Sequence, residues 1–252
     1  MKKSAKEAMK EILEQLKTSE VDNDNLLKGH RIDQYTDMIQ NNNTILVLNE
    51  EVMSKILSFS NANNESNYRE FGSYFYGKNI DNIIYISGYT GTDFEEADGL
   101  YEKGAVEVTQ RNLQEMDILT SKIENPYNVV VHFHTHPDHI KNKQGEIIVP
   151  SFKLYSENDL YSYAYHQVYM QPENNPVVYI GGMSCNNNGS PRINFVFYDI
   201  EEQAFCNINN IYYLEKDNLC KIENFSLLDT KVMDDDETSK INKRIRIITD
   251  KQ

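Results

Sequence analysis

The sequence has 252 residues, of which 39% are hydrophobic, and this length is enough for one large domain with a sizeable core. Its 39 acidic residues outnumber 25 basic ones, giving a formal charge of −14 that disfavours nonspecific binding to nucleic acids and to anionic membranes. Three cysteines without C-x-x-C spacing, no apolar signal segment, and apolar runs far below the roughly 20 residues of a membrane span predict a cytoplasmic protein.

Residues 1–43 are predicted to form an amphipathic helix followed by an irregular arm. Apolar residues recur at helical spacing between Ala5 and Leu16, whereas 21–43 is rich in Asn and Asp. The apolar stripe of this helix has to dock on the core or on a second subunit, so a homodimer through the helix is one expectation.

Strands and helices alternate between residues 44 and 200, which predicts one compact α/β (α+β) domain. Runs of β-branched and aromatic residues predict strands at 44–48, 70–77, 83–88, 129–136, 176–184 and 192–200. Helical spacing of apolar residues predicts helices at 51–60, 108–124 and 156–170. Polar sequence predicts a loop at 61–67 and an inserted loop or hairpin at 138–155.

Residues 201–252 are predicted to be a C-terminal extension of this domain. They contain an acidic run at 234–237, followed by 243–248, where basic residues and Ile alternate at the period of a strand. The simplest interpretation is a solvated loop and an edge strand.

The strand predicted at 129–136 carries three histidines at alternate positions. Side chains at i and i+2 of a strand point to the same face, so His132, His134 and His136 share one face. Adjacent members lie about 6.6–7 Å apart at Cα, from which two imidazoles can reach one zinc ion. His132 is one step deeper on the strand, where it lines the pocket, orients a ligand, or simply packs with a hydrogen bond.

A catalytic zinc site needs a third protein ligand and an open position, and Asp159 is the candidate for that ligand. It follows Ser156 by three residues at the start of a predicted helix, which is also the pattern of a capping box. A capping box would fix Asp159 in the first turn of the helix, where its carboxylate can complete a His₂Asp site. Glu70 opens an otherwise aromatic strand, so it is either exposed at an edge or functional.

A competing interpretation uses His134, His136, Asp138 and His139, which resemble the H-x-H-x-D-H motif of metallo-β-lactamase-like hydrolases. That family also needs histidines well downstream in the sequence. The only later histidine is His166, inside a predicted helix, so the ligand count favours the first interpretation.

Glu70, the segment His134-Thr135-His136-Pro137, and Ser156 with Asp159 together resemble the JAMM/MPN+ (JAB/MPN/Mov34-type) zinc metalloprotease family over roughly 44–200. The resemblance implies a curved, mostly antiparallel sheet flanked by helices. It also implies that zinc is bound by His134, His136 and Asp159, that Glu70 is the general base and acid, and that Ser156 donates to the oxyanion. The spacer before Ser156 is longer than in the family.

Members of this family cleave isopeptide bonds to ubiquitin or ubiquitin-like proteins, or peptide bonds near the C-terminus of small carrier proteins. The resemblance therefore implies a deubiquitinase-like metalloprotease or isopeptidase with a protein or peptide substrate. Two alternatives stay open, a non-catalytic MPN-type scaffold and the metallo-β-lactamase-like hydrolase. The complete set of five site residues favours the enzyme, because a scaffold has no need of them.

Overall fold

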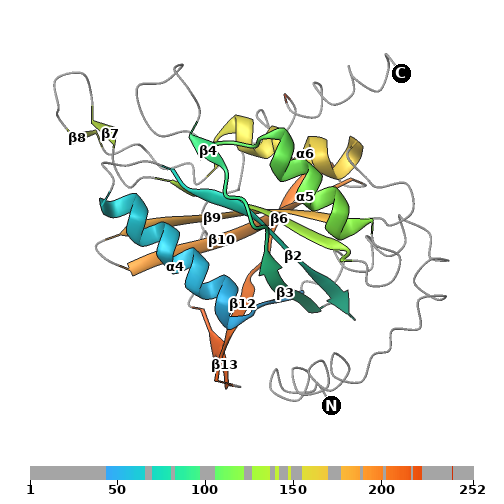
Figure 1. Cartoon of the computed structure of the whole chain (residues 1–252), viewed down its shortest axis with the longest axis horizontal. Coiled ribbons are helices and arrows are strands. Elements are labelled where there is room, and N and C mark those ends of the chain that lie inside the picture. Colours follow the sequence, from blue (N-terminus) through green and yellow to red (C-terminus); the bar gives the residue numbers. More distant parts are fainter. Residues whose placement is uncertain are drawn as a thin grey trace.

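The computed structural model describes residues 44–65, 70–80, 83–96, 106–121, 127–136, 140–141, 147–148, 155–169, 177–187, 190–200, 203–216, 218–222 and 240. Within these residues a single nine-stranded sheet is covered by three helices (Figure 1). The predicted N-terminal helix and arm at 1–43, the acidic run at 234–237 and the alternating segment at 243–248 lie outside the described residues.

The sheet has the strand order β11-β10-β9-β6-β2-β3-β1-β12-β13. Its strands, in chain order, are β1 (Ile45–Leu48), β2 (Gly72–Ile80), β3 (Ile83–Tyr89), β6 (Val129–His136), β9 (Val178–Asn187), β10 (Ser190–Asp199), β11 (Ala204–Asn207), β12 (Asn210–Glu215) and β13 (Asn218–Lys221). Five neighbouring pairs are antiparallel. The pairs β1–β3, β1–β12 and β6–β9 are parallel. A curled, mostly antiparallel sheet with helices, as predicted, is therefore confirmed.

Two short pairs of strands lie outside the main sheet. They are β4 (Glu95–Glu96) with β5 (Val106–Glu107), and β7 (Ile140–Lys141) with β8 (Ile147–Ile148). The second pair falls inside the segment 138–155, which the sequence predicts to be an inserted loop or hairpin. The four residues of β7 and β8 pair in an antiparallel manner, as the strands of a hairpin do.

The helices cover opposite faces of the sheet (Figure 1). One face carries α4 (Glu50–Glu65), and the other carries α5 (Gln110–Thr120) and α6 (Glu157–Tyr169). α4 is capped by Asn49, whose Oδ1 accepts the Val52 N–H at 2.7 Å, and it continues through most of the loop predicted at 61–67. α5 is shorter than predicted, because Thr109 forms a capping box at its start and Ser121 is its C-cap.

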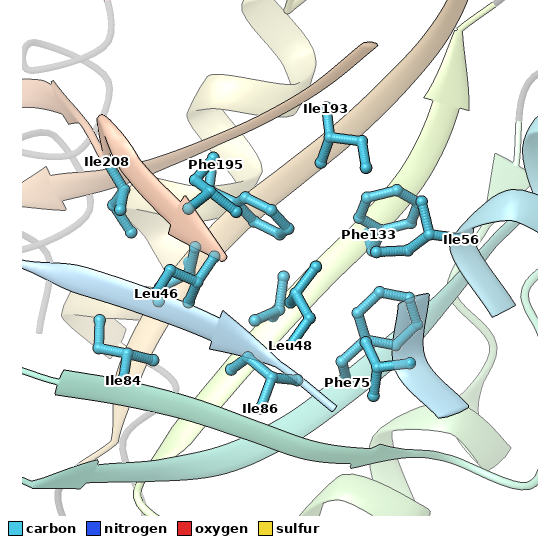
Figure 2. Close-up of a cluster of buried hydrophobic side chains, with 14 of the residues drawn as sticks. Leu46, Leu48, Ile56, Phe75, Ile84, Ile86, Phe133, Ile193, Phe195 and Ile208 are labelled. Atoms are coloured by element: carbon cyan, nitrogen blue, oxygen red, sulfur yellow. The ribbon is translucent and has the colours of Figure 1, made fainter. Parts of the chain in front are cut away.

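β6 separates two buried clusters by the alternation of its side chains. Val131 and Phe133 face α4, where Phe133 is fully buried and stacks on Phe75 with ring centroids 4.9 Å apart (Figure 2). Val130 belongs instead to the cluster under α5 and α6. Since residues of equal parity share a face, the histidines of β6 lie together on one face, as predicted, and this face is the α6 side of the sheet.

The sheet continues beyond residue 200, at which the sequence analysis ends the domain. β12 pairs in parallel with β1, and β11 pairs with β10, so residues 204–221 contribute three strands to the same sheet. These strands are short and mostly half-buried, and their apolar runs, Ala204–Cys206 and Ile211–Leu214, are brief and surrounded by polar residues. Among the residues that the structure describes, no helix is both long and apolar enough to cross a bilayer.

Truncation of Phe133 should destabilise the protein strongly, because this side chain fills the core behind the histidine strand. We expect Phe133→Ala to lower the free energy of unfolding by about 3–5 kcal/mol in urea denaturation. Ile118→Ala is the control, since Ile118 is 58% exposed on α5 and should cost no more than about 0.5 kcal/mol. Similar losses for the two variants would contradict this account of the core.

Candidate metal centre

Two segments far apart in the sequence bring an acid and two imidazoles together on the α6 side of the sheet. His134 and His136 come from β6, and their Nε2 atoms lie 2.9 Å apart. Asp159 comes from the first turn of α6, where its Oδ1 lies 3.6 Å from Nε2 of His134 and its Oδ2 lies 3.4 Å from Nε2 of His136. The structure therefore unites the three residues predicted as metal ligands.

The spacing of these donor atoms fits one zinc ion. A tetrahedral ion with bonds of ~2.0–2.1 Å separates its ligand atoms by about 3.3–3.4 Å. The two Nε2 atoms lie 2.9 Å apart, and the nearest carboxylate contacts, made by different oxygens of Asp159, are 3.4 and 3.6 Å, so the separations lie on both sides of this value. Two imidazole nitrogens and a carboxylate oxygen are also a donor set that zinc takes in enzymes. His134, His136 and Asp159 are thus suited to hold the ion.

Glu70 lies beside this triad. Its Oε1 is 3.9 Å from Nε2 of His136, and one oxygen of Glu70 lies within 4.8 Å of a nitrogen of both histidines. Proximity alone would also allow Glu70 to be a ligand. Asp159 is closer to His136 than Glu70 is, so we favour Asp159 as the third ligand, with Glu70 next to the open position.

The backbone around Thr135 places Glu70. Thr135, between the two histidines, accepts the Phe71 N–H on its Oγ1 at 2.9 Å, and its own N–H donates to the Phe71 carbonyl at 2.8 Å. The next residue, Gly72, pairs with His134, and a Cβ at Gly72 would lie 2.6 Å from the Phe133 carbonyl oxygen. β2 therefore approaches β6 closely at this point. The sequence analysis assigned no role to Thr135 or Gly72, although both stand within the motif segments.

The start of α6 fixes the Asp159 carboxylate. Oγ of Ser156 accepts the Asp159 N–H at 3.2 Å, and the Ser156 N–H donates back to Oδ2 at 2.8 Å, which is the predicted capping box. The Ser156 hydroxyl also donates to the same Oδ2 at 2.7 Å. Ser156 thus holds the ligand carboxylate here, and its role toward an oxyanion remains a prediction.

Tyr155 anchors the chain to the sheet immediately before this cap. It is 2% exposed, and its hydroxyl donates to Oδ1 of Asn194 on β10 at 2.8 Å. Its ring also packs edge-on against Tyr163 of α6. These contacts explain how Asp159 reaches the histidines in spite of the long spacer, and the sequence analysis did not identify Tyr155.

The two carboxyl groups of the site have opposite proton affinities. Burial raises the pKa of Glu70 to about 7. The charge of His136 and the Val106 N–H act to lower this pKa, and the charge of Asp159 adds to the rise. Burial also acts to raise the pKa of Asp159, but His134 and His136 outweigh it by charge and hydrogen bonding and hold that pKa well below its usual range. Asp159 is thus suited to be an ionised ligand, and Glu70 to exchange a proton near neutral pH.

His132 lies behind His134 in a shell of aromatic rings. It is 8% exposed, and its ring packs at steep angles against Tyr74, Phe94 and Tyr163, with centroids 4.8–5.5 Å away. Its Nδ1 has no hydrogen-bond partner among the residues that the structure describes. These contacts support packing as the role of His132. The hydrogen bond expected with that packing is not formed by Nδ1 among the described residues.

His166, which the competing metallo-β-lactamase-like interpretation would need, lies in α6 outside the triad. Its Nδ1 hydrogen-bonds to the Ser162 carbonyl at 2.8 Å, and its ring stacks on Tyr179. The other two residues that this interpretation adds, Asp138 and His139, lie outside the described residues. The described geometry therefore gives no support to His166 as a ligand.

The raised pKa of Glu70 has a consequence for stability in metal-free protein. The folded pKa of about 7 exceeds the ordinary value of 4.5, so the contribution of Glu70 to stability should be greatest below pH 4.5 and should be lost as the pH rises through 7. Since one pKa unit is worth about 1.4 kcal/mol, ionised Glu70 costs the fold on the order of 3 kcal/mol at pH 8. With a chelator present, we expect Glu70→Gln to unfold at a higher temperature than wild type at pH 8.

The same comparison at pH 4.5 should show almost no difference, because Glu70 is then protonated in the folded protein. Glu107→Gln on β5 is the matched control, since Glu107 is exposed, and it should leave stability within about 0.5 kcal/mol at either pH. A Glu70→Gln variant that is less stable than wild type at pH 8 would contradict the assignment.

Comparison of the sequence with models of known protein families gave no match, and comparison with curated proteins gave none either. The resemblance to JAMM/MPN+ proteases accordingly stays an expectation based on the motif residues. The geometry around His134, His136, Asp159 and Glu70 is what supports a function.

Proposed function

We propose that this protein is a zinc-dependent hydrolase of peptide or isopeptide bonds, of the JAMM/MPN+ type. One observation carries the proposal: the Asp159 carboxylate lies 3.4–3.6 Å from the Nε2 atoms of both His134 and His136. Glu70, two residues before the start of β2, has its Oε1 3.9 Å from Nε2 of His136, where a proton acceptor is needed.

The residues divide the work of amide hydrolysis. A zinc ion, when bound, lowers the pKa of water towards roughly 7 and polarises a carbonyl. Glu70 accepts the proton of the attacking water and returns it to the leaving nitrogen, a role worth about 10²–10⁴-fold in rate. This return matters because an amide nitrogen leaves poorly unless it is protonated. Asp159, held by Ser156, would bind the ion together with His134 and His136.

The proposed substrates follow from the family resemblance. They are an isopeptide bond to a ubiquitin-like protein, or a peptide bond near the C-terminus of a small carrier protein. A cytoplasmic location belongs to the same proposal, as does the absence of nucleic-acid and membrane partners, for which the charge of −14 is the support.

Two other functions make different predictions. A non-catalytic MPN-type scaffold would bind partners without turnover, even with zinc present. A metallo-β-lactamase-like hydrolase would hold two metal ions per chain. The raised pKa of Glu70 favours an enzyme over a scaffold. A carboxylate that exchanges a proton near neutral pH is useful in a reaction, whereas binding a partner does not require one.

The central test combines metal content with turnover. We expect wild type to hold about one zinc ion per chain by elemental analysis and to cleave a linear or isopeptide-linked ubiquitin-like conjugate. His136→Ala should lose both the zinc and the activity. Glu70→Gln should keep the zinc and lose at least about 10²-fold in kcat, because only the proton acceptor is removed.

His166→Gln is the matched control, since it removes a histidine of α6 that lies outside the triad. It should keep both zinc and activity. Undiminished zinc in His136→Ala would remove this residue from the site, and zinc-loaded wild type without turnover on both conjugates would favour the scaffold.

Substitution of Ser156 separates its two candidate roles. Ser156→Ala removes the hydroxyl that holds Oδ2 of Asp159, so we expect zinc binding on the order of tenfold weaker, measured by competition with a chelator. A residue that acts only on the oxyanion would instead lower kcat at full zinc occupancy. Ser162→Ala, which removes a hydroxyl six residues further along the chain in α6, is the control.

A further inference from the structure

Tyr163 lies directly behind one of the candidate ligands. It follows Asp159 by four residues in α6, so both side chains lie on the same face of the helix. Its hydroxyl oxygen is 3.3 Å from Nδ1 of His134, and its side chain is fully buried. Nδ1 is the imidazole nitrogen that the metal does not use, because the Nε2 atom of His134 faces His136 and Asp159.

The fold makes a fitted place for the Tyr163 ring. Gly181 on β9 pairs with His132 on β6, and a Cβ at Gly181 would overlap the ring of Tyr163. On its other sides the ring packs edge-on against Tyr155 and His132. The missing side chain at Gly181 thus lets the ring approach the backbone of β9 closely, and the rings of Tyr155 and His132 pack against it.

The contact between the Tyr163 hydroxyl and Nδ1 of His134 can determine which imidazole nitrogen carries the proton. His134 can bind a metal through Nε2 only if that atom carries a lone pair, so the ring proton has to reside on Nδ1. A proton on Nδ1 needs an acceptor, because a buried N–H without one is costly. The Tyr163 oxygen is the hydrogen-bond partner of Nδ1 in the described structure. Burial holds the pKa of the Tyr163 phenol well above its ordinary value, so this oxygen stays a neutral hydroxyl.

We propose that Tyr163 is a positioning residue of the metal centre, whose hydroxyl oxygen accepts the Nδ1–H of His134 and so selects the metal-binding tautomer. This inference rests on the proposed function in one respect, that His134 binds a metal. Tyr163 touches neither the substrate nor the reacting atoms, and it acts through the ligand alone.

Tyr163→Phe tests the inference, because it removes only the hydroxyl and keeps the ring in its place. We expect its dissociation constant for Zn²⁺ to rise about 10–100-fold over wild type, measured by competition with a chromophoric chelator. Tyr165→Phe makes the same chemical change on the same helix at a half-exposed residue whose ring contacts are to Tyr161, His166 and Tyr169. It should bind Zn²⁺ as wild type does.

A spectroscopic measurement distinguishes positioning from a loss of packing. In zinc-loaded wild type, ¹⁵N NMR of the imidazoles should show a protected Nδ1–H on His134, and in Tyr163→Phe this proton should exchange faster. Equal zinc affinity and equal exchange in the two proteins would overturn the inference while leaving the proposed function intact. Failure of wild type to bind Zn²⁺ at all would overturn both.

Gly181→Ala provides an independent route to the same contact. The added methyl group would displace the Tyr163 ring, so zinc affinity should fall in the same direction as in Tyr163→Phe. Near-UV circular dichroism of both variants establishes that the protein is folded. A folded Gly181→Ala protein with wild-type zinc affinity would contradict the proposal.

Discussion

The candidate site depends on the pairing of β6 between β2 and β9. Hydrogen bonds along both edges fix the register of this strand, antiparallel to β2 and parallel to β9. Phe133 then points into the core under α4, while His134 points towards α6. A slip of one residue would send the aromatic ring to the site and the imidazole to the core. The register of β6 therefore determines both the packing of the core and the positions of the donor atoms.

Helix α6 completes the site with two residues one turn apart. Asp159 faces the imidazoles, and Tyr163 lies behind one of them. Because both side chains belong to one rigid helix, the docking of that helix on β9 and β10 sets their positions together. Asp159 also serves the helix itself, through the capping box with Ser156. Local helix stability and ligand placement thus share the same hydrogen bonds.

Local patterns in the sequence predicted much of this arrangement, because they have short-range causes. The alternation of histidines follows from strand geometry, and the Ser156–Asp159 box follows from the needs of a helix start. Apart from the meeting of Glu70, His134, His136 and Asp159, which the family resemblance implied, contacts between distant segments escaped prediction. Strands β11 to β13 carry only short apolar runs, and their place is decided by the pairing of β11 with β10, of β12 with β1 and of β13 with β12. Likewise, the need for glycine at position 181 arises from the Tyr163 ring of α6, which packs against it and is distant in the sequence.

The anchoring of Tyr155 on Asn194 has a consequence for how this chain can vary. The segment between β6 and α6 is held at one end by sheet pairing and at the other by this buried phenol. Closing a longer loop between two fixed points costs only about 0.6 kcal/mol for each doubling of its length. Evolution can therefore lengthen, shorten or exchange the residues between these anchors while the carboxylate and the imidazoles keep their spacing.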